Sequence, residues 1–251
     1  MVPMSVKDVA RQIAKRAGFV VHRWPGNRFQ AMDDALRLLY RGGYRPGVVI
    51  DCGANCAQWF GVASPIFPDS EFHVIEAQDH CWPALDRAAA ARGRTHVHRT
   101  AVTAPGVRAV RMHRAGDPGN LGAFVIAESE PFPVDLLAAA TTLDELLAGR
   151  VEPGDRALLK LDIEGHELEA LRGAATLLDR VEVVVSEVRF FDVYASGRPV
   201  FGDVMAHLDA RGFALFDFAS LTGRRRDQRL FLGDAMFIRR GSPLGEDVRW
   251  D

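Results

Sequence analysis

Four acidic residues stand at or just beyond the ends of apolar runs that are typical of buried strands: Asp51, Glu76, Asp162 and Glu187. In an open parallel sheet, ligands bind beyond the carboxyl ends of the strands, near the point where the strand order reverses. Any one of these carboxylates is explained equally well as a helix cap or a solvated surface charge. Four of them in successive positions favour a shared site that accepts hydrogen bonds or protons.

The loop that begins at Asp51 has a composition suited to a ligand-binding turn. Gly53 allows close approach of the backbone, and Asn55 tolerates the left-handed conformation better than most residues. Glu76 follows 25 residues after Asp51, where its carboxylate can accept hydrogen bonds from two ribose hydroxyls. The loop lacks the Gly-x-Gly-x-x-Gly pattern that seats a pyrophosphate, which argues against a nicotinamide-dependent oxidoreductase. A nucleoside without phosphate and with a charged amino-acid tail fits better, which describes S-adenosylmethionine.

A more specific motif occupies residues 158–174 and reads LLKLDIEGHELEALRGA. It is preceded by VVIDCGAN at 48–55, VIE at 74–76 and TLDEL at 142–146. Together, in this order, these motifs resemble the FkbM-type family of S-adenosylmethionine-dependent methyltransferases over roughly residues 45–240. The sequence departs from that family at Ala57, where the loop usually has a glycine.

The resemblance implies both a fold and a cofactor site. The fold is α/β of class I (Rossmann-like) methyltransferase type, with a seven-stranded, mostly parallel sheet, helices on both faces and a terminal antiparallel strand. The cofactor is S-adenosylmethionine, with its ribose on Glu76. The other cofactor-binding residues are expected to be Asp51, Gly53, Ala54, Asn55, Ala77 and Asp162.

The segment after residue 161 carries groups that could move a proton. An alcohol acceptor has to lose a proton during methyl transfer, which requires a nearby base. His166 titrates nearest neutral pH and is the first choice, with Asp162 second and Glu164 as a further catalytic candidate. The family more often has a small residue at the position of His166, which favours a role specific to the substrate. The plain alternatives are an exposed first-turn histidine and, for Glu164, a favourable charge at a helix N-terminus.

A metal ion is not favoured by the sequence. Asp162 and Glu187 end neighbouring predicted strands and could share a Mg²⁺ ion that orients substrate oxygens, but the family signature does not require one. Cys52 and Cys56 lack the second ligand pair that zinc would need. The leading prediction is an O-methyltransferase acting on a hydroxyl of a small molecule such as a sugar, glycoside or polyketide. The alternative is a non-catalytic nucleoside-binding or scaffold protein on the same fold.

Strand-like runs alternate with helical stretches along most of the chain. Strands joined by helices imply right-handed crossovers and a parallel sheet covered on both faces. A Gly- and Pro-rich stretch at 106–133 predicts an irregular insertion near the site. The predicted strands are 48–50, 72–75, 96–102, 157–161 and 181–185, with helices at 81–92 and 168–178 and an antiparallel strand pair at 213–218 and 235–238.

Composition narrows the class of protein further. The 251 residues carry 31 basic and 33 acidic side chains, for a net charge of −2, so a dedicated nucleic-acid partner is not expected. No apolar stretch approaches the ~18 residues of a membrane span, and no secretion signal is evident. We therefore expect a cytoplasmic protein with a small-molecule acceptor and neither a nucleic-acid nor a membrane partner.

The first 44 residues differ from the rest and are predicted to form a helical extension outside the methyltransferase domain at 45–251. Apolar residues recur at helical spacing over 6–17 and again over 31–39. An apolar helical stripe needs a partner surface. The extension is predicted to cover the acceptor pocket as a lid or to form the contact of a homodimer, although such segments more often pack on their own domain.

Overall fold

The computed structural model describes residues 28–114, 122–127, 130–192 and 197–246, and in addition Ala14 and Ala17. The predicted helix at 6–17 therefore lies outside the described residues, apart from those two positions.

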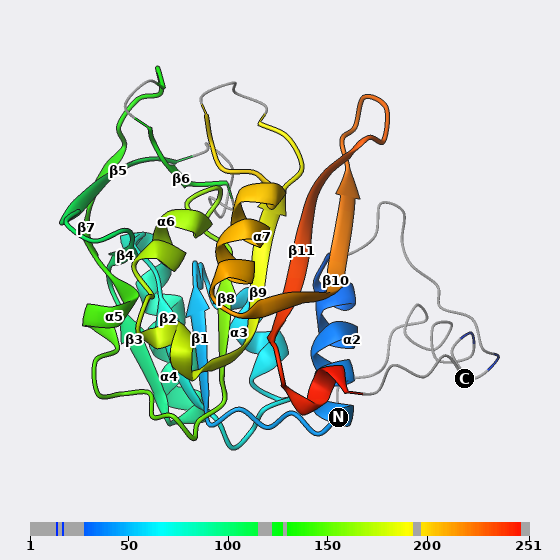
Figure 1. Cartoon of the computed structure of the whole chain (residues 1–251). Helices are drawn as coiled ribbons and strands as arrows, with labels where there is room; N and C mark the ends of the chain where they lie inside the picture. The colour runs from blue at the N-terminus through cyan, green and yellow to red at the C-terminus, as the bar shows by residue number, and fades with distance from the viewer. Residues whose placement is uncertain are drawn as a thin grey trace.

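A seven-stranded sheet forms the centre of the molecule (Figure 1). Its order is β10-β11-β9-β8-β1-β2-β3, and β11 runs antiparallel to its neighbours β9 and β10, whereas the remaining neighbours pair in parallel. This confirms the predicted class I methyltransferase arrangement, including a last strand that runs antiparallel. The strands are β1 (Val48–Cys52), β2 (Glu71–Ile75), β3 (Thr95–His98), β8 (Ala157–Leu161), β9 (Val181–Arg189), β10 (Phe213–Gly223) and β11 (Leu230–Arg239).

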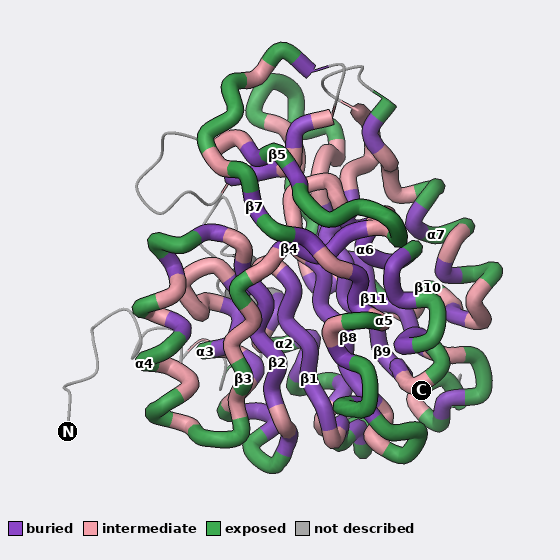
Figure 2. The backbone as a smooth tube through the Cα atoms, turned by 90° about the vertical axis from the view of Figure 1, so that its left-hand side faces the viewer, coloured by how far each residue is buried: buried purple, intermediate pink, exposed green. Residues whose placement is uncertain are grey.

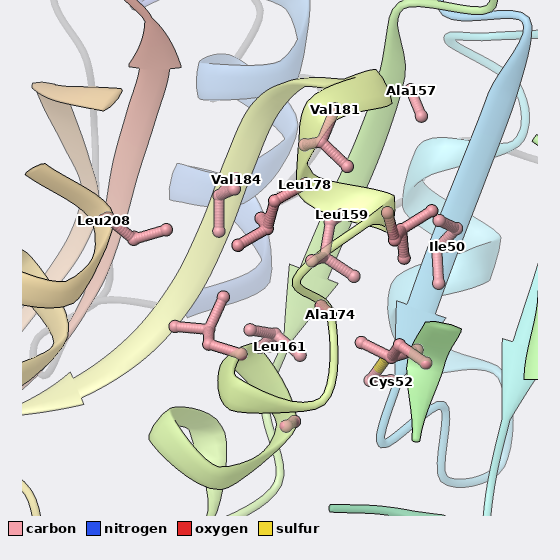
Figure 3. Packing of buried hydrophobic residues seen from close by; sticks show 14 of the residues in the cluster. Ile50, Cys52, Ala157, Leu159, Leu161, Ala174, Leu178, Val181, Val184 and Leu208 are labelled. Carbon is pink, nitrogen blue, oxygen red and sulfur yellow. The ribbon is translucent and has the colours of Figure 1, made fainter. Parts of the chain in front are cut away.

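Helices cover both faces of this sheet. The central strands β1 and β8 are buried at every position, as parallel strands between two helical layers must be. On one face, Leu143, Leu171 and Leu208 pack with Ile50 and other sheet residues into one apolar core (Figure 3), and a second core fills the opposite face. The helices are α2 (Arg28–Arg41), α3 (Gln58–Ala63), α4 (Trp82–Arg92), α5 (Leu143–Leu146), α6 (Glu167–Arg172) and α7 (Phe201–Ala210), with 3₁₀ turns η1 (Asp79–Cys81), η2 (Leu177–Arg180) and η3 (Pro243–Gly245).

The region predicted as an irregular insertion contains a second sheet instead. Its order is β4-β7-β5-β6, built from β4 (Ala101–Val102), β5 (Ala109–His113), β6 (Phe124–Val125) and β7 (Leu136–Thr141). The strand predicted at 96–102 is also divided, because the chain leaves the central sheet after His98 and joins the small sheet at Ala101. β4 and β6 have only two residues each, and β7 reads LLAAAT, without alternation of polar and apolar residues. Most of the small sheet therefore leaves no strand pattern in the sequence.

The helix predicted at 31–39 is present as α2 and is part of the core. Its Met32, Leu36 and Leu39 are buried with residues of α3 and the sheet. Figure 2 shows that the strands of the central sheet are mostly buried, whereas the outer turns of the molecule are exposed. The apolar face of α2 therefore has its partner surface within the chain. The domain boundary at residue 44, and a lid or dimer role for the preceding residues, stay predictions.

Replacing Leu36 with alanine is expected to lower the free energy of unfolding by about 2–5 kcal/mol, since a fully buried leucine leaves a cavity. Leu38, on the exposed side of the same helix at 47 % exposure, is the matched control, and Leu38→Ala should change stability by about 0.5 kcal/mol or less. Chemical denaturation of both variants checks this. Equal losses would mean that α2 does not belong to the core in solution.

Candidate functional site

A cavity opens at the carboxyl ends of β1, β2 and β8. The strand order reverses between β1 and β8, so this is where an open α/β sheet is expected to bind ligands. The predicted residues that line it are Gly53, Ala54, Asn55, Glu76, Ala77, Asp162, Glu164 and His166. Gln58, Trp59, Gln78 and Lys160 line it as well, and Met112, Ala123 and Val125 show that the small sheet supplies part of its wall.

The loop after β1 is built around Gly53. Its backbone has a φ of +78°, and a Cβ at this position would lie 2.0 Å from the carbonyl oxygen of Asp162. The amides of Gly53 and Ala54 both donate to the carbonyl of Ile75, at 3.0 and 3.1 Å. Only glycine therefore lets the ends of β1, β2 and β8 approach this closely.

Two residues of the same loop adopt left-handed backbone conformations. Asn55 has a φ of 44° and Ala57 a φ of 71°. The side-chain oxygen of Asn55 accepts from the amide of Cys56 at 2.7 Å, which is how asparagine is suited to this position. Ala57 replaces the glycine that is usual in the family, so this chain keeps the loop conformation at a cost of roughly 1 kcal/mol.

Glu76 presents a fixed carboxylate to the cavity. It is 5 % exposed, and its two oxygens accept hydrogen bonds from the backbone amides of Asn55 and Gln78, each at 2.8 Å. Burial raises the pKa of Glu76, while these two amides act in the opposite direction. A carboxylate has about four lone-pair sites, so the two amides fix its orientation and leave capacity for a pair of ligand hydroxyls.

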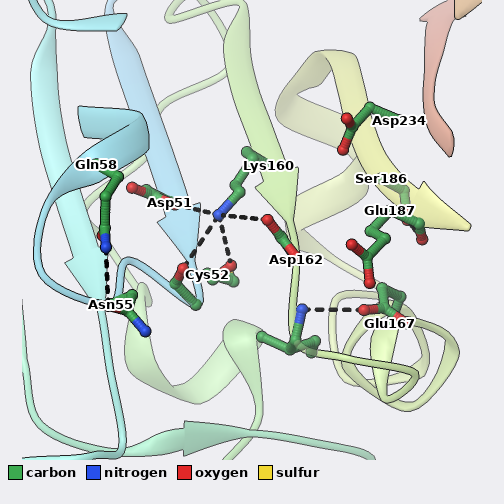
Figure 4. Close-up of polar contacts among 12 residues, drawn as sticks. Asp51, Cys52, Asn55, Gln58, Lys160, Asp162, Glu167, Ser186, Glu187 and Asp234 are labelled. Atoms are coloured by element: carbon green, nitrogen blue, oxygen red, sulfur yellow. Dashed lines mark hydrogen bonds and ion pairs between the residues drawn. The ribbon is translucent and has the colours of Figure 1, made fainter. Parts of the chain in front are cut away.

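Lys160 is a site residue that the sequence analysis missed. It is 3 % exposed in the middle of β8, and its Nζ lies 2.9 Å from Oδ1 of Asp51 and 3.7 Å from Oδ2 of Asp162. It also donates to the carbonyls of Cys52 and Gly53, at 3.4 and 3.1 Å (Figure 4). One ammonium group thus joins both strands at the point where their order reverses.

Asp51 lies behind the cavity wall. It is fully buried and is absent from the residues that line the cavity. Burial raises its pKa, and the charge of Lys160 opposes that rise. The predicted contact of Asp51 with a ligand therefore changes, in our interpretation, to an indirect role through Lys160.

His166 lies in the cavity wall, at the residue before α6. Its Nε2 is 2.9 Å from the hydroxyl oxygen of Thr103. Burial, and then the positive charge of Arg198, lower the pKa of His166 to about 4. The ring is therefore neutral near pH 7, which leaves it able to accept a proton but makes it a weaker base than a solvated histidine.

The loop before His166 brings three carboxylates together. Oxygens of Asp162, Glu164 and Glu187 lie within 4.8 Å of one another. Two cations contact this group: Arg189 donates to Glu164 at 3.1 Å, and Lys160, which also pairs with Asp51, lies 3.7 Å from Asp162. Glu187 does not end its strand as predicted; it lies inside β9, opposite Asp234 of β11. The two side-chain cations therefore offset part of the negative charge of this group.

Several aromatic residues lie near the carboxyl end of the sheet, and of these Trp59 lines the cavity. Phe60 packs edge-on against Phe72 in the core, at 5.2 Å between ring centroids. Phe190 and Phe191 pack against other phenylalanines near the sheet end, Phe190 against Phe201 and Phe218, and Phe191 against Phe231. Tyr194 lies outside the described residues.

Two cysteines that are far apart in sequence meet beside the cavity. The Sγ atoms of Cys56 and Cys81 are 3.0 Å apart, and Nε2 of His80 is 3.3 Å from Sγ of Cys81. The sequence analysis considered Cys52 and Cys56 together, but Cys52 is buried in the apolar core. The partner of Cys56 is 25 residues away, on the loop after β2, so only the fold brings the two together.

Comparison with known sequences identifies the family. The profile described as "Methyltransferase FkbM domain" matches residues 51–215, which is most of the chain. The match includes the end of β1 from Asp51, the Glu76 position and the segment from Lys160 to His166. The chain belongs to the FkbM methyltransferase domain family. Among curated proteins, a search finds no matching relative.

Solved structures with a similar overall path include three methyltransferases. The N-methyltransferase NodS of Bradyrhizobium japonicum, in complex with S-adenosyl-L-homocysteine, is 9 % identical with a TM-score of 0.49, over 84 % of this chain and 87 % of that one. The 1,6-didemethyltoxoflavin-N1-methyltransferase of Burkholderia thailandensis is 14 % identical with a TM-score of 0.44, over 83 % of this chain and 78 % of that one. An rRNA methylase of Streptococcus thermophilus is 12 % identical with a TM-score of 0.44, over 82 % of this chain and 93 % of that one. The family assignment rests on the matched profile.

Proposed function

We propose that this chain is an S-adenosylmethionine-dependent O-methyltransferase that acts on a hydroxyl of a small molecule, such as a sugar, glycoside or polyketide-type compound, in the cytoplasm. The observation that carries the cofactor assignment is Glu76, whose buried carboxylate is held by two backbone amides at the cavity wall. No phosphate-binding glycine pattern accompanies it. A nucleoside without phosphates fits these donors and acceptors.

The residues around the cavity divide into two groups in this proposal. When bound, the cofactor would supply an electrophilic methyl group on sulfur. Glu76 would accept hydrogen bonds from its ribose, and the backbone of Gly53 to Asn55 would hold its amino-acid end. Asp162, Glu164 and His166 lie on the neighbouring loop, where they can orient an acceptor hydroxyl and take its proton. Part of the catalysis then comes from holding the acceptor in line.

Among the described residues, no helix is both long and apolar enough to cross a bilayer. In this proposal, the small-molecule acceptor enters the cavity at the carboxyl ends of the strands from solution. A homodimer contact through the N-terminal residues remains part of the proposal, with the oligomeric state in solution as its test.

Substituting Glu76 with alanine is expected to weaken S-adenosylmethionine binding by about 10- to 150-fold, because hydrogen bonds to a charged group are worth about 1.5–3 kcal/mol. Calorimetric titration of wild type and variant with S-adenosylmethionine, S-adenosylhomocysteine and NAD measures this. Asp86→Ala, which removes an exposed carboxylate on α4, is the matched control and should bind normally. Unchanged affinity in Glu76→Ala would refute the ribose assignment, and binding of NAD alone would refute the cofactor.

The acceptor is tested separately, with methyl-labelled cofactor and a panel of sugars, glycosides and polyketide lactones. A new methyl ether located by NMR supports O-methylation, and a methyl on nitrogen or carbon contradicts it. Cofactor binding without turnover on any acceptor would instead favour the alternative, a nucleoside-binding or scaffold protein.

A further inference from the structure

Histidines gather with a glutamate on one face of the sheet edge, away from the cavity. Glu71 and His73 belong to β2, and His96 and His98 belong to the edge strand β3, which lies beside β2 in Figure 2. His73 and His96 are direct partners in the parallel register. Since side chains alternate along a strand, all four residues project from the same face.

The distances between these side chains match a metal coordination sphere. Oε1 of Glu71 lies 3.0 Å from Nε2 of His96 and 3.4 Å from Nε2 of His73, and the three candidate ligand atoms lie within 4.8 Å of one another. Zinc binds nitrogen and oxygen at ~2.0–2.2 Å, so two ligands of a tetrahedral site stand roughly 3.3–3.5 Å apart. The oxygen–nitrogen distances fit such an ion. The rings of His73 and His96 are stacked, with centroids 4.9 Å apart at 17°, so one ring has to turn for both nitrogens to face a common centre.

A second observation is the environment of the His73 ring, which is completely buried. Its Nδ1 lies 2.9 Å from Nε2 of His98. Its Nε2 is buried and makes no hydrogen bond among the described residues, and Oε1 of Glu71 lies 3.4 Å from it. A buried nitrogen without a partner is costly. Metal-bound histidines characteristically use their other ring nitrogen in a hydrogen bond, and His98 provides one here.

The other candidate metal groups in the described part of the chain are less suitable. The sulfurs of Cys56 and Cys81 are 3.0 Å apart, whereas two thiolates on tetrahedral zinc stand roughly 3.8 Å apart. The carboxylates around Asp162 already contact Lys160 and Arg189. Among these groups of described residues, the sheet-edge group combines fitting distances with a buried ring nitrogen that makes no hydrogen bond.

We propose that Glu71, His73 and His96 bind a divalent transition-metal ion, with zinc as the best fit, and that His98 orients His73 from behind. Neutral imidazole and carboxylate ligands suit zinc, and the half-exposed side of the site, where His96 is 44 % exposed, leaves a position for water.

The ion would join the edge strand β3 to β2. β3 has four residues, one neighbour in the sheet and the helix α4 packed against it. The carbonyl of His98 accepts a hydrogen bond from the amide of Glu76 at 3.0 Å. Stabilising this edge therefore supports the backbone that carries the carboxylate of the cavity, and the ion is structural in this proposal.

The experiment uses the full chain, stripped with chelator and then titrated with ZnCl₂ without any cofactor. Calorimetry and metal analysis should give one zinc per chain, and zinc should raise the melting temperature, because a ligand that binds only the folded state stabilises it. His96→Ala should lose both effects, while its melting temperature without metal stays close to wild type. Glu71→Gln should also lose binding, and His98→Ala should weaken it about 10- to 100-fold.

Cys56→Ala is the control that separates the two candidate sites, and it should bind zinc like wild type. Loss of zinc in Cys56→Ala would place the ion at the cysteines and overturn the proposal. The proposal is also overturned if wild type and His96→Ala take up the same amount of zinc, or if wild type takes up none.

Discussion

Replacing Lys160 with methionine is expected to lower the free energy of unfolding by about 3–5 kcal/mol, which for a chain of this size lowers Tm on the order of 10 °C. The substitution keeps most of the buried aliphatic volume but removes the ammonium. Asp51, which is fully buried 2.9 Å away, then becomes a buried charge without its cation. The carbonyls of Cys52 and Gly53 lose a donor in the same step.

The double variant Asp51→Asn/Lys160→Met separates the charge effect from a packing effect. Removing both charges should recover much of the loss, because well-packed neutral side chains can replace a buried ion pair at little cost. The pH dependence of the stability of Lys160→Met also separates the charge effect from the packing effect. Asp51 already has a raised pKa, and without Lys160 it should rise further, so protonation relieves the unpaired charge. The destabilisation of Lys160→Met should therefore be smaller at pH 5 than at pH 8.

An exposed ion pair provides the matched control. Arg99 and Asp86 lie 2.9 Å apart with about half of each side chain exposed, and Arg99→Met should cost at most about 1 kcal/mol. Chemical denaturation of the four proteins at both pH values makes the comparison. A Lys160→Met variant no less stable than Arg99→Met would show that the pair at the strand reversal does not hold β1 and β8 together.

Lys160 also shows what the sequence could have revealed. It is one of three lysines in the chain, against 28 arginines, and the other two lie at positions 7 and 15. A single lysine within an otherwise apolar buried run indicates a compact cation that must be paired. Its partners could not be read from the sequence, because Asp51 is more than 100 residues away and is brought close only by the parallel pairing of β1 and β8.

The central sheet was predictable because burial on both faces produces continuous apolar runs. The prediction was weaker where polar residues continue a strand. The run at 181–185 was expected to end before Ser186 and Glu187, yet both pair with β11, so β9 extends to Arg189. The cavity residues near Gly53 and Glu76 were predictable from the topology rule for strand ends. The small sheet and the histidine group were not, because they depend on contacts between segments with no local signal.

The assignment of His166 as the general base leads to the second large expected effect, a loss of turnover. His166→Ala should lower the turnover number by about 10²- to 10⁴-fold, the usual contribution of a general base, while cofactor affinity stays nearly unchanged. His166→Gln tests whether the ring only positions its neighbours, since glutamine can keep a hydrogen bond to Thr103 but cannot take up a proton. If Gln restores turnover, His166 is a positioning residue; if Gln is as slow as Ala, it is the base.

The pH profile of wild type is expected to follow the lowered pKa of His166. The ring is the base in its neutral form, so turnover should fall as pH decreases through about 4, where the ring becomes protonated. Between pH 6 and 8 its protonation state is constant, and no acidic limb is expected there. A limb near pH 6.5 that disappears in His166→Ala would contradict the burial of this histidine in solution.

A metal at Asp162 and Glu187 would change this result, since a bound cation can acidify the acceptor hydroxyl directly and reduce the need for His166. Chelator treatment distinguishes a metal-assisted mechanism from one that uses His166 as the base. It should be done in the His96→Ala background, so that removal of zinc from the sheet edge does not affect the result. We expect turnover to resist the chelator and to depend on His166, because Lys160 and Arg189 already contact the carboxylates and His166 lies in the cavity wall. Loss of turnover with chelator and its return with Mg²⁺ would instead assign the chemistry to a metal. Turnover that survives both chelator and His166→Ala would leave Asp162, or positioning of the acceptor alone, as the source of catalysis.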